Sequence, residues 1–224
     1  MKYLIFDAGP IISLSMNGLL DVLDKIKRNF NGEFVITPQV KREVVDRPIV
    51  TKKFELEALK VKDLIERGTL RISSDFIPAN KLEKETNNVM KITNSVLRYA
   101  KTRNKINIIH RGEASCIAFA NLCKCENLIV IDERSTRLLI ESPKNLKELI
   151  ERKVHSRIDS NFDLVKNYDN LKFIRSAELL IYAYKNNLFS LKKDKQLLEA
   201  LLYAVKFTGT SISSKEIENA KKLV

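Results

Sequence analysis

The sequence predicts an α/β fold built around a parallel sheet. Three short runs, residues 3–6, 34–36 and 128–131, consist only of aliphatic and aromatic side chains, as expected for strands buried on both faces. Helical stretches separate these runs, and strands that alternate with helices are typical of a parallel sheet. With 224 residues, 44% of them hydrophobic, the chain can bury one sizeable core and carry a smaller appendage.

The first expected element is a strand over residues 3–6, which ends at Asp7. Pro10 suits the first turn of a helix, because the N–H that proline lacks would have no helical partner there. Apolar residues between positions 19 and 26 keep helical spacing. The chain is therefore predicted to begin with a strand followed by helical structure.

A second strand is expected over residues 34–36, followed by a helix that carries Glu43. Thr37 can cap the N-terminus of this helix with its hydroxyl group, and Pro38 suits the first helical position. This pair places the start of the helix directly after the strand.

The middle of the chain is richer in charge. A charged helix is predicted from about Thr51 to Arg67, with Gly68 as its stop. Residues 70–72 suit a third short strand, and residues 73–109 include a long polar helical stretch without a clear turn signal. We expect residues 51–112 to form a mainly helical insertion.

Gly112 opens a helix of small residues that begins with Glu113, and small side chains let a helix lie close to a sheet. The run 128–131 is the clearest buried strand, and it ends in Asp132. Further helices are expected over residues 135–141, 146–152, 177–185 and 195–207, with Ser213 and Glu216 forming a capping box for a last helix.

The formal net charge is +12, which predicts a polyanionic partner because phosphates attract lysine and arginine over long distances. Residues 51–112 carry 14 basic and 7 acidic side chains and hold most of the excess. The alternative is that lysine-rich helices merely present solvated faces. Both interpretations remain open at the level of the sequence.

Features of targeting and redox chemistry predict a soluble protein of a reducing, cytoplasmic compartment. Asp7 interrupts the first apolar run, so no signal peptide is expected, and no stretch approaches the roughly 20 apolar residues of a membrane span. The cysteines, Cys116, Cys123 and Cys125, have neither a second pair nor histidines at zinc-finger spacing, so we expect free thiols.

Two predicted strands end in an aspartate, Asp7 and Asp132. In an open parallel sheet, ligands bind outside the carboxyl ends of the strands. Two carboxylates placed there repel each other unless a cation lies between them, and Mg²⁺ prefers oxygen ligands. Such ions activate water in phosphodiester hydrolysis. Glu43 and Glu113, on flanking helices, are the candidates to complete the site.

Each of the four acids also has a structural interpretation. An aspartate after a strand is often only the N-cap of the next helix, which applies to Asp7 and Asp132. Glu43 could lie on a solvated helix face, and Glu113 could only complement a helix dipole. The pattern of all four acids together favours a shared site more strongly than any single residue does.

The sequence blocks around these acids resemble those of the PIN-domain nucleases, and they occur in the family's order. The similar blocks are residues 5–14 (IFDAGPIISL), 36–45 (ITPQVKREVV), 110–120 (HRGEASCIAFA) and 129–137 (IVIDERSTR). Each block is short, and the series is more specific than its parts. The helical tail over residues 177–188 is similar to that of a subgroup that includes prokaryotic toxins of toxin–antitoxin pairs.

This resemblance implies a PIN-like α/β/α sandwich with a central parallel sheet. The helical insertion over residues 51–112 would interrupt a catalytic domain over 1–154, and residues 155–224 would form a helical C-terminal extension. It also implies a ribonuclease that uses Mg²⁺ or Mn²⁺ to cut single-stranded or structured RNA, with Asp7, Glu43, Glu113 and Asp132 as catalytic and metal-binding residues. A small antitoxin protein and a second copy of the chain are the further partners that it allows.

Several other residues are candidates for supporting roles. Glu133 would be a weaker metal ligand, acting through water. Lys52, Lys53, Lys60, Lys62, Arg134 and Arg137 are the candidate RNA contacts. For the two arginines, pairing with Glu133 and Glu141 on the helix surface is the favoured alternative.

The sequence departs from the family pattern in three places. Gly9 stands where many relatives have a hydroxyl residue, and Glu43 and Glu113 are 70 positions apart. No fifth strand is evident after the fourth block, since residues 142–144 lead into more helix. These departures leave substrate choice and the C-terminal architecture open.

Three other functions compete with a nuclease. An RNA-binding scaffold of the same fold would be free to lose the acids that are present here. A receiver-type phosphoacceptor domain would need adjacent acids after the first strand, where Ala8 and Gly9 stand. A phosphatase for small esters would need a second aspartate two positions after Asp7, which is again Gly9.

Overall fold

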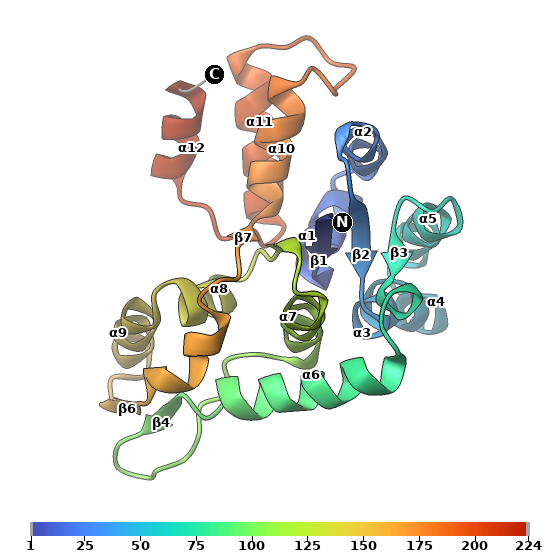
Figure 1. Cartoon of the computed structure of the whole chain (residues 1–224). Coiled ribbons are helices and arrows are strands. Elements are labelled where there is room, and N and C mark those ends of the chain that lie inside the picture. Colours follow the sequence, from blue (N-terminus) through green and yellow to red (C-terminus); the bar gives the residue numbers. More distant parts are fainter. Residues whose placement is uncertain (1, 223–224) are drawn as a thin grey trace.

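The computed structural model describes residues 2–222 and has a parallel sheet at its centre (Figure 1). The five strands lie in the order β3-β2-β1-β5-β7. Their bounds are β1 (Lys2–Phe6), β2 (Glu33–Ile36), β3 (Arg71–Ile72), β5 (Glu126–Val130) and β7 (Phe173–Ile174). The prediction of an α/β fold with a central parallel sheet is confirmed, as are the strands predicted at residues 3–6, 34–36 and 70–72.

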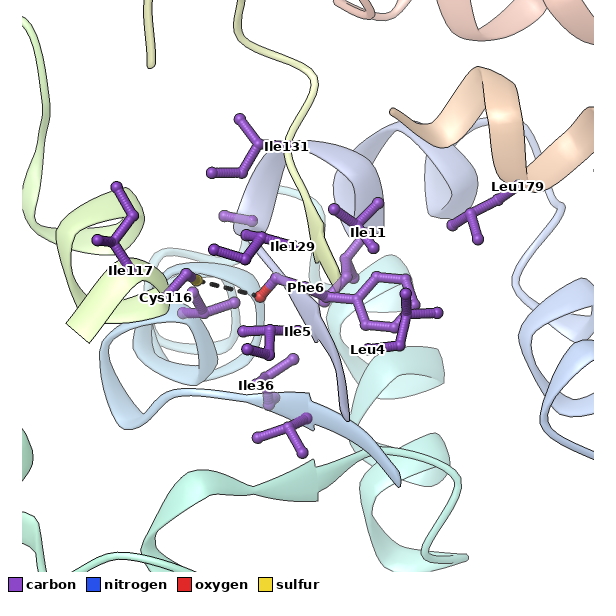
Figure 2. Packing of buried hydrophobic residues seen from close by; sticks show 14 of the residues in the cluster. Leu4, Ile5, Phe6, Ile11, Ile36, Cys116, Ile117, Ile129, Ile131 and Leu179 are labelled. Atoms are coloured by element: carbon purple, nitrogen blue, oxygen red, sulfur yellow. Dashed lines mark hydrogen bonds between the residues drawn. The ribbon is translucent and has the colours of Figure 1, made fainter. Parts of the chain in front are cut away.

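Helices cover both faces of the sheet. Along β1, successive side chains point to opposite faces, as in any strand. Leu4 and Phe6 point toward Ile11 and Leu179, whereas Ile5 points toward Cys116 (Figure 2). All of these side chains except that of Leu179 are at most 3% exposed. The apolar run therefore forms a strand because both of its faces are buried.

The two faces are covered by different parts of the chain. One carries α1 (Ala8–Met16), α2 (Asp21–Asn29) and α10 (Ser176–Lys185), and α10 contacts both of the other helices. The other carries α7 (Arg111–Cys123), with α6 (Ala79–Thr93) packed outside it (Figure 1). The small residues of α7 allow this close approach, and the thiol of Cys116 donates a hydrogen bond to the carbonyl of Phe6 at 3.5 Å.

A broken helical segment follows β2. Thr37 caps α3 (Pro38–Lys41) by accepting a hydrogen bond from the Val40 N–H at 3.2 Å, as predicted. The helix continues through a π-helical turn, η1 (Arg42–Asp46), into α4 (Arg47–Thr51). The helix predicted from Thr51 begins later, as α5 (Glu55–Glu66), because Lys52 and Phe54 have left-handed φ values of 63° and 62°.

Residues 51–112 are mainly helical, yet they also contribute strands. They contain β3, a short helical turn η2 (Ser73–Asp75), α6 and β4 (Leu97–Tyr99). β4 pairs antiparallel with β6 (Ile158–Ser160). Because β3 is an edge strand of the central sheet, the segment expected as an insertion takes part in the core fold.

The last part of the chain is also joined to the sheet. Its elements are α8 (Arg134–Glu141), α9 (Pro143–Val154), β6, η3 (Phe162–Tyr168), β7, α10, α11 (Lys195–Phe207) and α12 (Ser214–Lys222). The expectation that no fifth strand follows the fourth block is wrong, since β7 pairs with β5. The expected boundary at residue 155 thus precedes a strand of the central sheet.

Two smaller expectations are met within residues 2–222. The capping box exists, because the Ser213 N–H donates to Glu216 at 2.8 Å and the Glu216 N–H donates to the Ser213 hydroxyl at 3.2 Å. The three cysteines are free thiols. In the same part of the chain, no helix has the length and apolar character needed to cross a membrane.

Candidate active site at the carboxyl edge of the sheet

Asp7 lies at the carboxyl end of β1, in the middle of the sheet. Its N–H donates to the Val130 carbonyl at 3.0 Å, so the neighbouring strand fixes its backbone. Its carboxylate caps α1 and accepts a long, 3.5 Å hydrogen bond from the Gly9 N–H. The side chain is buried, with 8% of its surface exposed. The capping role weighed at the level of the sequence is therefore real, and it leaves most of the carboxylate's acceptor capacity unused.

Glu43 reaches the same region from the π-helical turn η1. A π-turn inserts an extra residue into a helix and changes the direction of the side chains that follow, and such turns are frequent at functional sites. Gln39 donates a hydrogen bond to the Glu43 carboxylate at 2.8 Å. The hydroxyls of Thr37 and Ser115 lie 2.6 Å apart and join the start of α3 to α7. The sequence alone did not predict this π-turn.

Gly112 shows how close the carboxylates of Asp7 and Glu43 lie. A Cβ atom built on Gly112 would lie 3.3 Å from Asp7 Oδ1, and 3.2 and 3.3 Å from the two carboxylate oxygens of Glu43. Both acids thus border the space next to a single point on α7. Glycine at this position leaves that space empty.

Glu113 is the next residue of α7, and it is 6% exposed. Its carboxylate accepts a hydrogen bond from the His110 N–H at 2.6 Å, which stabilises the start of the helix. The exposed side chain of Glu133 also shares a hydrogen bond with Glu113. Glu133 therefore lies beside the acids, where it was expected.

Asp132 follows β5, and its carboxylate is held by the C-terminal part of the chain. Oδ1 accepts a hydrogen bond from the Ser176 N–H at 2.8 Å. The Ser176 hydroxyl lies 3.0 and 2.9 Å from Oδ1 and Oδ2, and the Thr210 hydroxyl donates to Oδ2 at 2.9 Å. A Cβ atom on Gly9 would lie 3.8 Å from both Asp132 Cβ and Asp7 Oδ2, so Asp132 neighbours Asp7.

Burial and mutual repulsion raise the pKa values of these acids. Burial, together with the charges of Glu43 and Asp132, raises the pKa of Asp7 to about 7, against hydrogen bonds from Ala8 and Gly9 that lower it. Burial, the hydrogen bond with Glu133 and the charge of Asp7 raise the pKa of Glu113 to about 8.

The pKa of Asp132 is also raised, chiefly by burial. The hydrogen bonds from Ser176 and Thr210 act in the opposite direction. Of the other charged groups, Glu178 raises this pKa further. Protons thus neutralise part of the negative charge at this edge of the sheet when no cation is present.

This group of acids has no direct ion-pair partner among the described residues, although the charge of Arg137 interacts with Asp132. Within residues 2–222, none of Asp7, Glu43, Glu113, Asp132 and Glu133 forms an ion pair. In the same residues, no three His, Cys, Asp or Glu side chains are arranged so that they could hold a metal ion as they stand.

The donor set nevertheless suits one class of ligand. The five acids offer carboxylate oxygens, which hard divalent cations prefer. Mg²⁺ commonly binds through only one or two carboxylates and keeps several waters. Asp7 and Glu43, which border the empty space beside Gly112, are the pair best placed for direct contact.

The lysines predicted to bind RNA lie on α5 or in the link before it, and two of the four form ion pairs. Lys52 pairs with Glu55 at 2.7 Å and Lys62 with Glu66 at 3.5 Å, both on the surface. Lys53 lies over the ring of Phe54, 5.2 Å from its centre. Lys60 is exposed.

The two predicted arginines differ from each other. Arg134 is exposed at the start of α8. Arg137 is half-buried and donates to the Ser211 hydroxyl at 2.8 Å, which binds it to the C-terminal segment. Within residues 2–222, neither arginine forms the expected ion pair with Glu133 or Glu141.

Three arginines that were not predicted line cavities next to Glu43. One cavity of about 690 Å³ is bordered by Glu43, Arg42 and Arg47, and another of about 450 Å³ by Arg42 and Arg111. Among the described residues, Arg42 and Arg47 form no ion pair, whereas Arg111 pairs with Glu83. The only sequence signal was the position of Arg42 directly before Glu43.

Comparison with known proteins gives no match. No family model, no curated protein and no solved structure matches it. Function must therefore be argued from the site.

Proposed function

We propose that this chain is a metal-dependent endoribonuclease of the PIN-domain type. The observation that carries the proposal is the group formed by Asp7, Glu43, Glu113, Asp132 and Glu133, which lies at the carboxyl edge of a parallel sheet without an ion-pair partner among the described residues. Such a concentration of negative charge is stable when a cation occupies it. The order of the four sequence blocks supports a PIN-like α/β/α sandwich.

In this proposal, each acid has a separate task. Asp7 and Glu43 hold the cation, which would be Mg²⁺ or Mn²⁺, and Glu113 and Glu133 orient water on the side of α7. Asp132 contributes a further carboxylate to the metal site from the end of β5. When bound, the cation lowers the pKa of water and stabilises the charge that develops on a phosphodiester.

Basic side chains around the acids supply affinity for RNA. Arg42 and Arg47 line the cavity that contains Glu43, and guanidinium groups bind phosphate in a bidentate manner. Lys53 and Lys60 add positive charge on α5 and in the link before it. These contacts recognise the phosphate backbone, which fits single-stranded or structured RNA and leaves the sequence of the target open.

The second candidate is a PIN-like scaffold that binds RNA without cutting it. The observation that favours it is that no three of the acids stand ready to hold a metal ion among residues 2–222. A toxin of a toxin–antitoxin pair, whose partner would be a small antitoxin protein, is a biological role compatible with the nuclease. The experiment below separates cutting from binding.

The test compares the wild type with Asp7→Asn on labelled single-stranded RNA in Mg²⁺, in Mn²⁺ and in EDTA. The amide keeps the shape of the side chain but removes its charge, so the rate is expected to fall by at least about 100-fold while RNA binding persists. Asp163→Asn is the matched control, since Asp163 is an exposed partner of Lys166 outside the acid group.

Cleavage that persists undiminished in EDTA or in Asp7→Asn would refute the metal-nuclease proposal. A well-folded wild type that binds RNA tightly but cuts none of a varied set of RNAs would support the scaffold. Equal losses in Asp7→Asn and Asp163→Asn would show that the effect is not specific to the site.

A further inference from the structure

Asp132 differs from the other acids because three protein donors bind its carboxylate. The Ser176 N–H, the Ser176 hydroxyl and the Thr210 hydroxyl all lie within 3.0 Å of its oxygens. An ionised carboxylate has about four acceptor sites. The three donors therefore leave about one acceptor site of the Asp132 carboxylate free.

The two hydroxyl residues form a buried pair. Ser176 is fully buried and begins α10, and Thr210 is 3% exposed in the link between α11 and α12. Their hydroxyl oxygens lie 2.6 Å apart. Each hydroxyl lies within hydrogen-bond distance of both the other hydroxyl and the Asp132 carboxylate, and each has a single proton to donate.

Further contacts hold Thr210 in place. Gly209, just before it, has a φ of +120°, which side-chain-bearing residues rarely adopt. The Ser211 N–H donates to the Asp132 carbonyl at 3.3 Å. Arg175 donates to the Ser211 carbonyl at 2.8 Å, and Arg137 donates to the Ser211 hydroxyl at 2.8 Å. Hydrogen bonds to the Asp132 carbonyl, to Arg137 and to Arg175 thus hold this link next to Asp132.

We infer that Ser176 and Thr210 are positioning residues that orient the Asp132 carboxylate within the metal site and thereby make the site depend on the docked C-terminal segment. This inference rests on the proposed function, because it assigns the acid group a cation. Hydrogen-bond partners of metal-site carboxylates typically change metal affinity by about 10- to 100-fold when they are removed. Neither Ser176 nor Thr210 lies in any of the four sequence blocks.

The test measures Mn²⁺ binding to the full-length protein directly, by the loss of the free-ion signal in electron paramagnetic resonance. Thr210→Val and Ser176→Ala remove one hydroxyl each and are expected to weaken Mn²⁺ binding by about 10-fold or more. Thr210→Ser restores the hydroxyl and is expected to bind nearly as the wild type does. Cleavage of RNA against Mn²⁺ concentration is recorded in parallel.

Thr208→Val is the matched control. Thr208 lies two residues before Thr210, and its hydroxyl contacts the Ser13 hydroxyl at 2.5 Å and the Asn17 amide at 3.0 Å, but no acid. Its loss should lower the thermal unfolding temperature and leave the Mn²⁺ dissociation constant unchanged. This control separates a structural hydroxyl from a positioning one.

The outcomes distinguish the inference from the proposed function. Mn²⁺ binding that is unchanged in Thr210→Val and Ser176→Ala, or weakened equally in Thr208→Val, overturns the positioning role while the nuclease proposal stands. If the wild type binds Mn²⁺ but cuts no RNA, the nuclease proposal fails, and the order of Mn²⁺ affinities among the variants still decides the inference. A wild type that binds no Mn²⁺ overturns both.

Discussion

Gly112 has a side-chain position that points into the space shared by Asp7 and Glu43. A methyl group there would lie 3.2–3.3 Å from their oxygens, which is closer than nearly all real contacts of this kind. We predict that Gly112→Ala keeps all acids but lowers RNA cleavage by about 100-fold, because displaced reacting groups cost that much. Initial rates with saturating Mn²⁺ measure the effect.

Gly9→Ala provides the control for this prediction. A methyl group on Gly9 would lie 3.8 Å from Asp7 Oδ2 and Asp132 Cβ, an ordinary contact distance. Gly9→Ala should therefore cleave RNA at close to the wild-type rate. If Gly112→Ala is as active as Gly9→Ala, the space beside Gly112 is not where the reaction occurs.

Asp7 should make stability depend on pH when no metal is present. Its pKa is about 7 in the folded protein, against 3.8 for an aspartate in an unfolded chain. A raised pKa means that its favourable contribution is complete below about pH 4 and is lost as the pH rises through about 7. Glu113, with a pKa of about 8, acts in the same direction.

We therefore predict that Asp7→Asn is more stable than the wild type by a few kcal/mol at about pH 8 in EDTA, and that this difference disappears at about pH 3.5. Urea unfolding followed by circular dichroism measures it. Mn²⁺ should stabilise the wild type more than the variant. A variant that is less stable at every pH would contradict the crowded, uncompensated acid group.

The sequence predicted the acids far better than it predicted their surroundings. Asp7 and Asp132 were found because each ends an apolar run, and parallel strands place such ends at one edge. Ser176 and Thr210 were missed because they lie 44 and 78 positions from Asp132 and single hydroxyl residues have no pattern of their own. Only the folded chain brings these donors to the carboxylate.

At the level of elements, predictability mostly followed length, and the exception is β3, which has two residues and was predicted as a strand at residues 70–72. Strands of four or five residues, such as β1 and β2, were visible as apolar runs. β7, with two residues, and β4 and β6, with three each, are too short to leave a pattern. β7 forms because β5 at the edge of the sheet supplies its backbone partners, and β4 and β6 form because they pair with each other.

The link between α4 and α5 contains backbone strain that the sequence did not predict. Lys52 has a left-handed φ of 63° at the end of α4, a conformation that favours glycine. We predict that Lys52→Gly raises the free energy of unfolding by about 0.5–1 kcal/mol, because the surface ion pair with Glu55 that it loses contributes little. Urea unfolding at neutral pH measures the change.

Lys53→Gly is the matched substitution for this prediction. Lys53 does not have a positive φ, so glycine there only increases the flexibility of the unfolded chain. It should lower the free energy of unfolding. If the two variants shift stability in the same direction, the left-handed conformation of Lys52 is not strained.

Across the whole molecule, the net charge of +12 is divided between paired and free side chains. Within residues 51–112, ion pairs with acids are formed by Lys52, Lys62, Arg67, Arg71, Arg103 and Arg111. The remaining excess of this segment is what could attract RNA. The interpretation as a solvated surface and the interpretation as an RNA-binding surface still compete, and the salt dependence of binding separates them.

We predict that combined reversal of Lys52, Lys53, Lys60 and Lys62 to glutamate weakens RNA binding and flattens its dependence on salt. Each lost phosphate contact on single-stranded RNA reduces the slope of log affinity against log salt by about 0.7. The control reverses Lys144, Lys147 and Lys153 of α9 together with Lys166. In Figure 1, α9 lies on the opposite side of the molecule from α5, and the control changes the net charge by the same amount. Fluorescence anisotropy at several salt concentrations, with an inactive Asp7→Asn background, measures both slopes. Because both variants lower the net charge equally, a general electrostatic effect would change their affinities alike. A larger loss of slope in the α5 variant alone would show that this surface contacts the phosphates, whereas equal slopes would show that it is only solvated.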